Sequence, residues 1–95
     1  MNHELKTDPE PFNDIIEGRK TFEIRWNDRN FQVGDRLILR QTKHTAVEML
    51  EGAPLEYTGA FWSVDVIGIL HGPAYGIDKG YCVMSLKTYC EEVKQ

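Results

Sequence analysis

The sequence predicts a small, mainly β (α+β) domain in which about five strands curl into a barrel and one helix lies near the N-terminus. Several stretches alternate between apolar and polar side chains, as half-buried strands do: 21–26, 36–41 and 59–70, with a last strand at 81–86. The longest run contains Gly68, at a place where a strand curling around a small barrel needs a bend or bulge.

The length of 95 residues fits a single domain that spans 1–95 and has one core. Its composition, 41% hydrophobic and 27% charged, is typical of a soluble globular protein. No apolar run approaches the ~20 residues that span a bilayer, and the N-terminus lacks the apolar stretch of a signal peptide. We therefore expect a cytoplasmic protein with no membrane partner.

The chain begins with a short edge strand at 3–6, followed by the one early helix. Asp8 is suited to cap the N-terminus of this helix, and Pro9 fits its first turn. Apolar side chains then recur at helical spacing: Phe12, Ile15 and Ile16. Gly18 is predicted to end the helix as a residue with positive φ.

The strand at 21–26 has two chemically different faces. Phe22, Ile24 and Trp26 share one face, which we expect to pack into the core. Thr21, Glu23 and Arg25 form the opposite, polar face. A turn at 27–30 and a Val33-Gly34-Asp35 turn lead into the strand at 36–41, whose inner face is predicted to be Leu37 and Leu39.

The second half of the chain is predicted to be mostly strand. Residues 42–57 show no sustained alternation, although 45–51 fits a turn of helix that Gly52 to Pro54 would end. In the strand at 59–70, Trp62 is expected in the core, and Cys82 in the last strand is expected to be a small buried apolar residue. Cys90 follows eight positions later.

Four polar or small residues between the early helix and the first alternating strand form a compact motif. Gly18, Lys20, Glu23 and Arg25 lie within eight positions. Strand backbone holds side chains more firmly than a loop does, so this is where a small domain would keep a polar site. Glu23 and Arg25 lie two apart, which places both on one face of the strand.

This motif resembles the pattern G-x-K-x-x-E-x-R of the ASCH (activating-signal-cointegrator homology) family, small β-barrels related to PUA RNA-binding domains. All four fixed positions match. The continuation through 27–35 is also similar, as are 3–6 and the stretch from Tyr75 to Tyr81 in a branch found in bacteria and phages. The resemblance implies a PUA-like barrel that binds RNA or a nucleotide.

Two interpretations of Glu23 and Arg25 stay open. In the first, Arg25 grips an anionic or carbonyl group and Glu23 accepts a hydrogen bond from an exocyclic amine of the ligand. In the second, the two side chains form an ion pair that merely orders the mouth of the barrel. Lys20 is predicted to belong to the turn after Gly18 and to swing toward the polar face, as a phosphate contact or as a solvated surface lysine.

The resemblance also raises an enzymatic alternative. Some similar ASCH proteins are amidohydrolases that act on acetylated cytidine, using the motif lysine, a threonine and a downstream glutamate. In this chain the lysine is Lys20, Glu23 stands at the position of that threonine, and Thr21 is displaced by two. A carboxylate beside Lys20 favours an ammonium that holds a ligand over a neutral base, so we expect no catalytic residue and no hydrolysis of such nucleosides.

Charge is distributed unevenly along the chain. Residues 18–43 carry seven Lys or Arg and three Asp or Glu, whereas the segments before and after are each net acidic. We expect this basic block to attract a phosphate or one nucleotide. If the ligand is longer than one nucleotide, outlying phosphate contacts would come from Arg29, Arg36 and Arg40. Tyr75 in a glycine-flanked loop would stack on a base.

The sequence therefore predicts an RNA- or nucleotide-binding domain with ligand contacts at Lys20, Glu23, Arg25, Arg29 and Tyr75. A small amidohydrolase with Lys20, Thr21 and Glu23 as candidate catalytic residues is one alternative. An interaction module that has kept the scaffold without a ligand site is another. The three histidines have no Cys or His partner at zinc-ligand spacing, so we expect neither a metal nor a cofactor.

Overall fold

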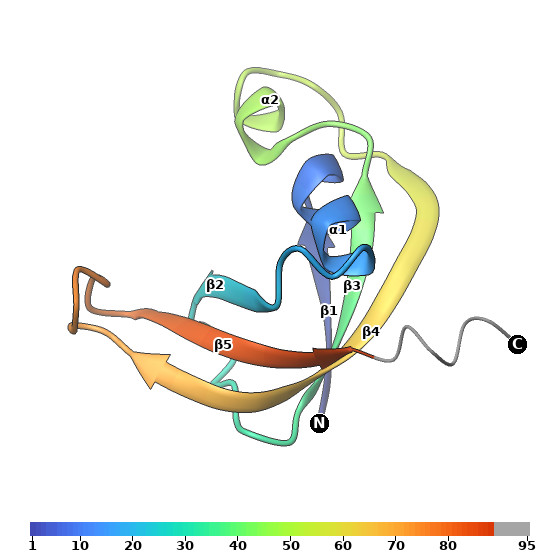
Figure 1. Cartoon of the computed structure of the whole chain (residues 1–95). Coiled ribbons are helices and arrows are strands. Elements are labelled where there is room, and N and C mark those ends of the chain that lie inside the picture. Colours follow the sequence, from blue (N-terminus) through green and yellow to red (C-terminus); the bar gives the residue numbers. More distant parts are fainter. Residues whose placement is uncertain (89–95) are drawn as a thin grey trace, which may run out of the picture.

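The computed structural model describes residues 1–88, which contain five strands and two short helices (Figure 1). In chain order the elements are β1 (Asn2–Thr7), α1 (Pro9–Ile16), β2 (Phe22–Trp26), β3 (Arg36–Thr42), α2 (Ala46–Leu50), β4 (Tyr57–His71) and β5 (Tyr81–Thr88). This confirms the predicted fold class, a small, mainly β domain with five strands and one early helix.

All five strands belong to one curled sheet, with the order β1-β3-β4-β5-β2. β1 runs parallel to β3, and the other neighbouring pairs are antiparallel. β1 and β2 are therefore the outer strands, and the sheet curls into a half-barrel in which no ladder pairs β1 with β2 within residues 1–88. We call the gap between these two outer strands the seam.

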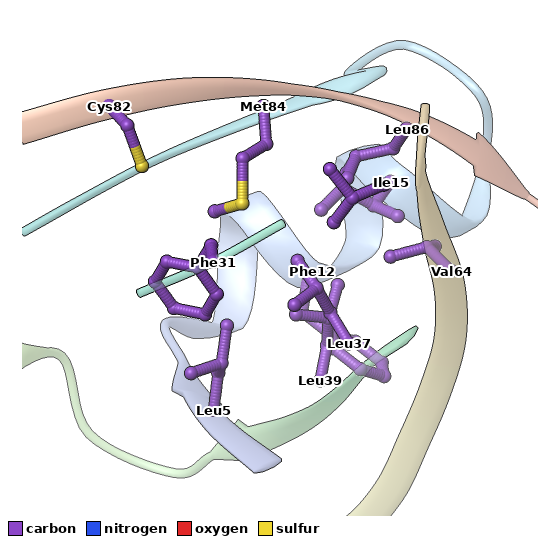
Figure 2. Close-up of a cluster of buried hydrophobic side chains, with 11 residues drawn as sticks. Leu5, Phe12, Ile15, Phe31, Leu37, Leu39, Val64, Cys82, Met84 and Leu86 are labelled. Carbon is purple, nitrogen blue, oxygen red and sulfur yellow. The ribbon is translucent and has the colours of Figure 1, made fainter. Parts of the chain in front are cut away.

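The core lies inside the curl of the sheet and is closed by α1 (Figure 2). Phe12 and Ile15 of α1 are fully buried, as is Phe31 from the loop between β2 and β3. The strands supply the remaining buried apolar side chains: Leu5, Leu37, Leu39, Val64, Val66, Cys82, Met84 and Leu86. The predicted burial of Leu37, Leu39 and Cys82 is confirmed, and burial raises the pKa of the Cys82 thiol. Cys90 lies outside the described residues.

β4 changes its inward face at the predicted bulge. The pairing of β4 with β5 shifts register between Val66 and Gly68. A Cβ atom on Gly68 would lie 2.7 Å from Ser85 Oγ, so the two strands approach closely there. After the shift Ile69 packs against the core while Leu70 is exposed. Trp62, predicted to be a core residue, is partly buried and packs against the core from its edge.

The start of α1 differs from the prediction in one detail. Asp8 is the N-cap residue, but its side chain makes no capping hydrogen bond. The reason is that Pro9 and Pro11 leave two of the first three helical positions without an N–H to donate. Asp8 Oδ1 instead accepts a hydrogen bond from Ala46 N at 3.0 Å, which ties α2 to the start of α1. α2 confirms the predicted helical turn, and Thr45 and Glu48 cap it reciprocally.

The predicted orientation of β2 is wrong. Glu23 faces inward and is 3% exposed, whereas Phe22, Ile24 and Trp26 lie on the outer face, with Trp26 56% exposed. The physical reason is that β2 is an outer strand whose inward face looks into the seam, where polar groups of β1 lie, and not into the apolar core. Trp26 packs outside the sheet, edge-on against Tyr81 at 5.4 Å between ring centroids.

A buried polar cluster joins the N-terminus to the start of β3. His3 Nε2 and Asp35 Oδ2 are 2.8 Å apart, and the same carboxylate accepts from Gln32 N at 3.0 Å. The N-terminal ammonium of Met1 lies 3.3 Å from Asp35 Oδ1. The hydrogen bond with His3, assisted by those from Gln32 and the N-terminus, lowers the pKa of Asp35 despite its burial.

Asp35 should consequently make the free energy of unfolding depend on pH in the acidic range. Because its pKa is lowered on folding, its contribution is present above the unfolded value of about 3.9 and is lost as the pH falls through the lower folded value. We expect Asp35→Asn to lower the free energy of unfolding by about 1–3 kcal/mol at pH 7, with a smaller difference from the native protein at pH 3. Urea denaturation at both pH values measures this. The exposed Asp28→Asn is the matched control, and an Asp35→Asn effect that is the same at both pH values would contradict the account.

Candidate functional site

The motif residues meet in a three-membered charge cluster at the seam. Lys20 Nζ lies 2.5 Å from Glu23 Oε1, and Arg25 Nε donates to Glu23 Oε2 at 2.8 Å. Both carboxylate oxygens of Glu23 therefore hold a cation. The carboxylate is buried, while the side chains of Lys20 and Arg25 are 21% and 25% exposed. The cluster carries a net charge of +1 and turns its positive groups toward solvent.

Local structure explains how three residues so close in sequence converge. Gly18 has φ +81°, a left-handed conformation that glycine adopts without strain, and it ends α1 as predicted. The chain then leaves the helix so that Lys20 lies just before β2, and its side chain reaches forward to Glu23, as the sequence predicted. Alternation along β2 places Glu23 and Arg25 on the same inward face.

Two arginines bridge the seam to the outer edge of β1. Arg25 Nη2 donates to the carbonyl of Lys6 at 3.0 Å and lies 3.4 Å from Thr7 Oγ1. Arg29 Nη1 donates to the carbonyl of Glu4 at 2.7 Å. These carbonyls belong to alternate residues of an outer strand and would otherwise lack a sheet partner on that side. The two guanidinium groups thus supply hydrogen bonds that a neighbouring strand would otherwise donate to β1.

A pocket of about 270 Å³ lies beside the charge cluster. It is open to solvent between the end of β1, the start of α1, α2 and β2. Its lining consists of Lys6, Thr7, Asp8, Pro11, Lys20, Glu23, Ile24, Arg25 and Ala46. We call it the motif pocket. It contains three cationic and two acidic side chains, and its size suits a group no larger than a phosphate with part of a sugar or base.

A second hollow follows the same edge of β1. This pocket of about 170 Å³ is lined by Glu4, Leu5, Lys6, Arg29, Arg40 and Tyr57, and we call it the Tyr57 pocket. Lys6 lines both pockets. The two hollows are therefore neighbours along β1, one at its C-terminal end and one nearer its middle.

The predicted site residues divide into three groups. The structure brings together Lys20, Glu23 and Arg25, and it places Arg29 in the neighbouring pocket. Thr21 is exposed and lines neither pocket; its carbonyl accepts from Leu86 N at 3.0 Å. Tyr75 is 93% exposed in the loop between β4 and β5, and it lines neither the motif pocket nor the Tyr57 pocket. The structure therefore does not bring Tyr75 to the motif.

Several residues that line the two pockets were not predicted from the sequence. Lys6, Asp8 and Ala46 reach the motif pocket through the β1–β3 pairing and through the Asp8–Ala46 hydrogen bond, both of which join distant parts of the chain. Tyr57 stands at the start of β4 and had no neighbouring pattern to mark it. The basic block at 18–43 was the one available signal, and it pointed to Arg40 as well as Arg29.

No helix within residues 1–88 is long and apolar enough to cross a membrane. In the same part of the chain, no group of three or more His, Cys, Asp or Glu side chains is arranged to hold a metal ion.

A curled five-stranded sheet with a cationic pocket at its seam defines a small, mainly β domain with a candidate ligand site. The chain belongs to the family described as Domain of unknown function (DUF3850), which matches residues 2–86. That match runs from β1 into β5 and includes both pockets. No curated protein matches the chain. The resemblance to the ASCH family stays a prediction.

Removal of the Glu23 charge should destabilise the protein. Glu23→Gln leaves Lys20 and Arg25 close together without the buried carboxylate between them. We expect a loss of about 2–3 kcal/mol in the free energy of unfolding, somewhat below that for a fully buried pair because both cations are partly exposed. Chemical denaturation at pH 7 measures it.

The matched control is Glu17→Gln, the same chemical change at an exposed ion pair with Arg19. We expect it to cost less than about 1 kcal/mol. Equal losses for the two variants would mean that the Glu23 cluster is an ordinary surface ion pair.

Proposed function

We propose that the motif pocket binds the phosphate-bearing part of a nucleotide or of single-stranded RNA. The observation that carries this proposal is the Glu23 carboxylate, which is buried and holds two cations at the wall of an open pocket. An ion pair that merely orders a strand needs no adjacent hollow, so the pocket favours a ligand site over a scaffold without one.

The donors of the cluster suit an anionic group. Arg25 donates hydrogen bonds from Nε and Nη2 to Glu23, Lys6 and Thr7. Within residues 1–88 its Nη1 has no hydrogen-bond partner. Lys20 gives one of its three N–H groups to Glu23. A phosphate oxygen or a base carbonyl in the pocket would accept from the remaining donors.

Glu23 has an organising role in this proposal. Both of its oxygens already have a partner, and its side chain is almost fully buried. It therefore holds Lys20 and Arg25 in fixed positions before a ligand arrives, which reduces the entropy that binding must offset. Direct acceptance of a hydrogen bond from a base amine would use the lone pairs that remain.

The amidohydrolase alternative gains no support from this arrangement. A general base needs a free lone pair aimed at its substrate. Lys20 Nζ is instead directed at Glu23 Oε1, and Thr21 lies outside the pocket. We therefore propose a binding domain.

The test is the substitution Arg25→Lys, which keeps the charge and removes the planar guanidinium. We expect it to weaken the binding of nucleoside 5′-monophosphates by about 1–3 kcal/mol, because a lysine cannot contact Glu23 and the ligand with separate edges of one fork. Isothermal titration calorimetry with the four common ribonucleotides measures the affinity.

Arg19→Lys is the matched control, because Arg19 is exposed and pairs with Asp14 and Glu17. Thermal unfolding of both variants checks that the fold is intact. Native affinity in a folded Arg25→Lys protein would reject Arg25 as a ligand contact.

Salt dependence provides an independent test with RNA. Cations of the basic block should neutralise about two to four phosphates, so the logarithm of the affinity should fall with the logarithm of salt concentration at a slope of about −1.4 to −2.8. Fluorescence anisotropy with a labelled oligouridylate at several salt concentrations gives the slope. A slope near zero would mean that the basic block is a solvated face.

A further inference from the structure

The Tyr57 pocket has features that the motif pocket lacks. The guanidinium of Arg40 lies over the Tyr57 ring, with Cζ 3.8 Å from the ring centre, so the two groups are in cation–π contact. Arg40 is 40% exposed, and its ion pair with Glu4 is long, 3.7 Å between Nη1 and Oε1. One face of this Arg–Tyr pair is therefore accessible, and the exposed ion pair costs little to break.

Lys6 links the two pockets. This residue lines both of them, and within residues 1–88 its ammonium makes no hydrogen bond or ion pair. Its backbone carbonyl is held by Arg25, which fixes the position of the residue. A cation without a partner in the described part of the chain thus belongs to a residue shared by two hollows, each of which is lined by an arginine.

The charge of the Tyr57 pocket is also positive. Its lining has three cationic residues, Lys6, Arg29 and Arg40, and one acid, Glu4. The backbone carbonyl of Glu4 accepts a hydrogen bond from Arg29. Planar stacking surface together with uncompensated cations is the combination that binds a base and its phosphate. A hollow that bound an apolar peptide would need an apolar lining, and Leu5 is the one aliphatic residue among the described residues that line this pocket.

We propose that the Tyr57 pocket is a second nucleotide subsite, so that the seam binds a single strand of at least two nucleotides. The phosphate-bearing part of one nucleotide occupies the motif pocket, the neighbouring base stacks on the exposed face of Arg40, and Lys6 contacts the phosphate between them. Arg29 contacts the outer phosphate. The inference rests on the proposed function of the motif pocket. It selects a single strand because a base can stack on Arg40 only when it has left its own helix.

The test compares uridine 5′-monophosphate with a 5′-fluorescein-labelled tetrauridylate, using the full chain. We expect the tetranucleotide to bind about 10-fold or more tightly than the mononucleotide. Tyr57→Ala should weaken the tetranucleotide by about 5- to 100-fold and leave the mononucleotide within about 2-fold. Tyr75→Ala, at the hairpin tip, is the matched control and should change neither affinity.

A second variant, Lys6→Gln, tests the same subsite if Tyr57→Ala does not fold. Lys6→Gln removes an ammonium that has no partner within residues 1–88, and Lys79→Gln makes the same change in the hairpin loop, away from both pockets. Lys6→Gln should weaken the tetranucleotide by about 3-fold or more at low salt and lower the steepness of its salt dependence by about one phosphate contact. Lys79→Gln should not.

The outcomes separate the two proposals. Binding of uridine 5′-monophosphate that Arg25→Lys weakens, with no gain for the tetranucleotide or no effect of Tyr57→Ala and Lys6→Gln, overturns the second subsite and leaves the motif pocket intact. Equal affinity for the tetrauridylate and for a uridine–adenosine RNA duplex also overturns it. Absence of binding by mononucleotide and tetranucleotide alike overturns the proposed function and, with it, this inference.

Discussion

A buried carboxylate at the open edge of the sheet determines how the rest of the seam is arranged. Glu23 faces inward from an outer strand and would be an unpaired buried charge without Lys20 and Arg25. Its partners come from the turn after α1 and from β2 itself, and Arg25 extends the connection to the carbonyl of Lys6 in β1. One charge therefore joins three segments that no ladder pairs directly within residues 1–88.

The same arrangement explains why the sheet remains open at this place. β1 pairs with β3 on one side, and on its other side two carbonyls accept hydrogen bonds from Arg25 and Arg29. Side chains, unlike a paired strand, leave hollows between them, and both the motif pocket and the Tyr57 pocket lie along this edge. The guanidinium groups that bridge the seam thus both stabilise the outer strand and create a cationic surface. This coupling of fold and surface charge is what we interpret as a binding site.

Much of the fold could be predicted because its signals are local. Leu37 and Leu39 are buried as their alternation indicates, since β3 is flanked by strands on both sides, and the bulge falls at Gly68. The inward face of β2 was predicted wrongly, because alternation reveals two faces without saying which is interior, and at an outer strand the polar face can point inward. The spacing of the motif predicted the Lys20–Glu23–Arg25 cluster. Contributions from β1 and β4 depend on long-range pairing, which periodicity does not report.

We propose above all that the phosphate-bearing part of a nucleotide enters the motif pocket and meets the cations held by Glu23. Amide chemical-shift mapping by NMR during titration with uridine 5′-monophosphate tests it most directly, because it locates the ligand residue by residue. We predict that the largest shifts fall at the end of β1, from Lys6 to Asp8, and in β2 around Glu23 and Arg25. Shifts confined to the outer face of the sheet, near Trp26 and Tyr81, or the absence of shifts at millimolar nucleotide, would contradict it.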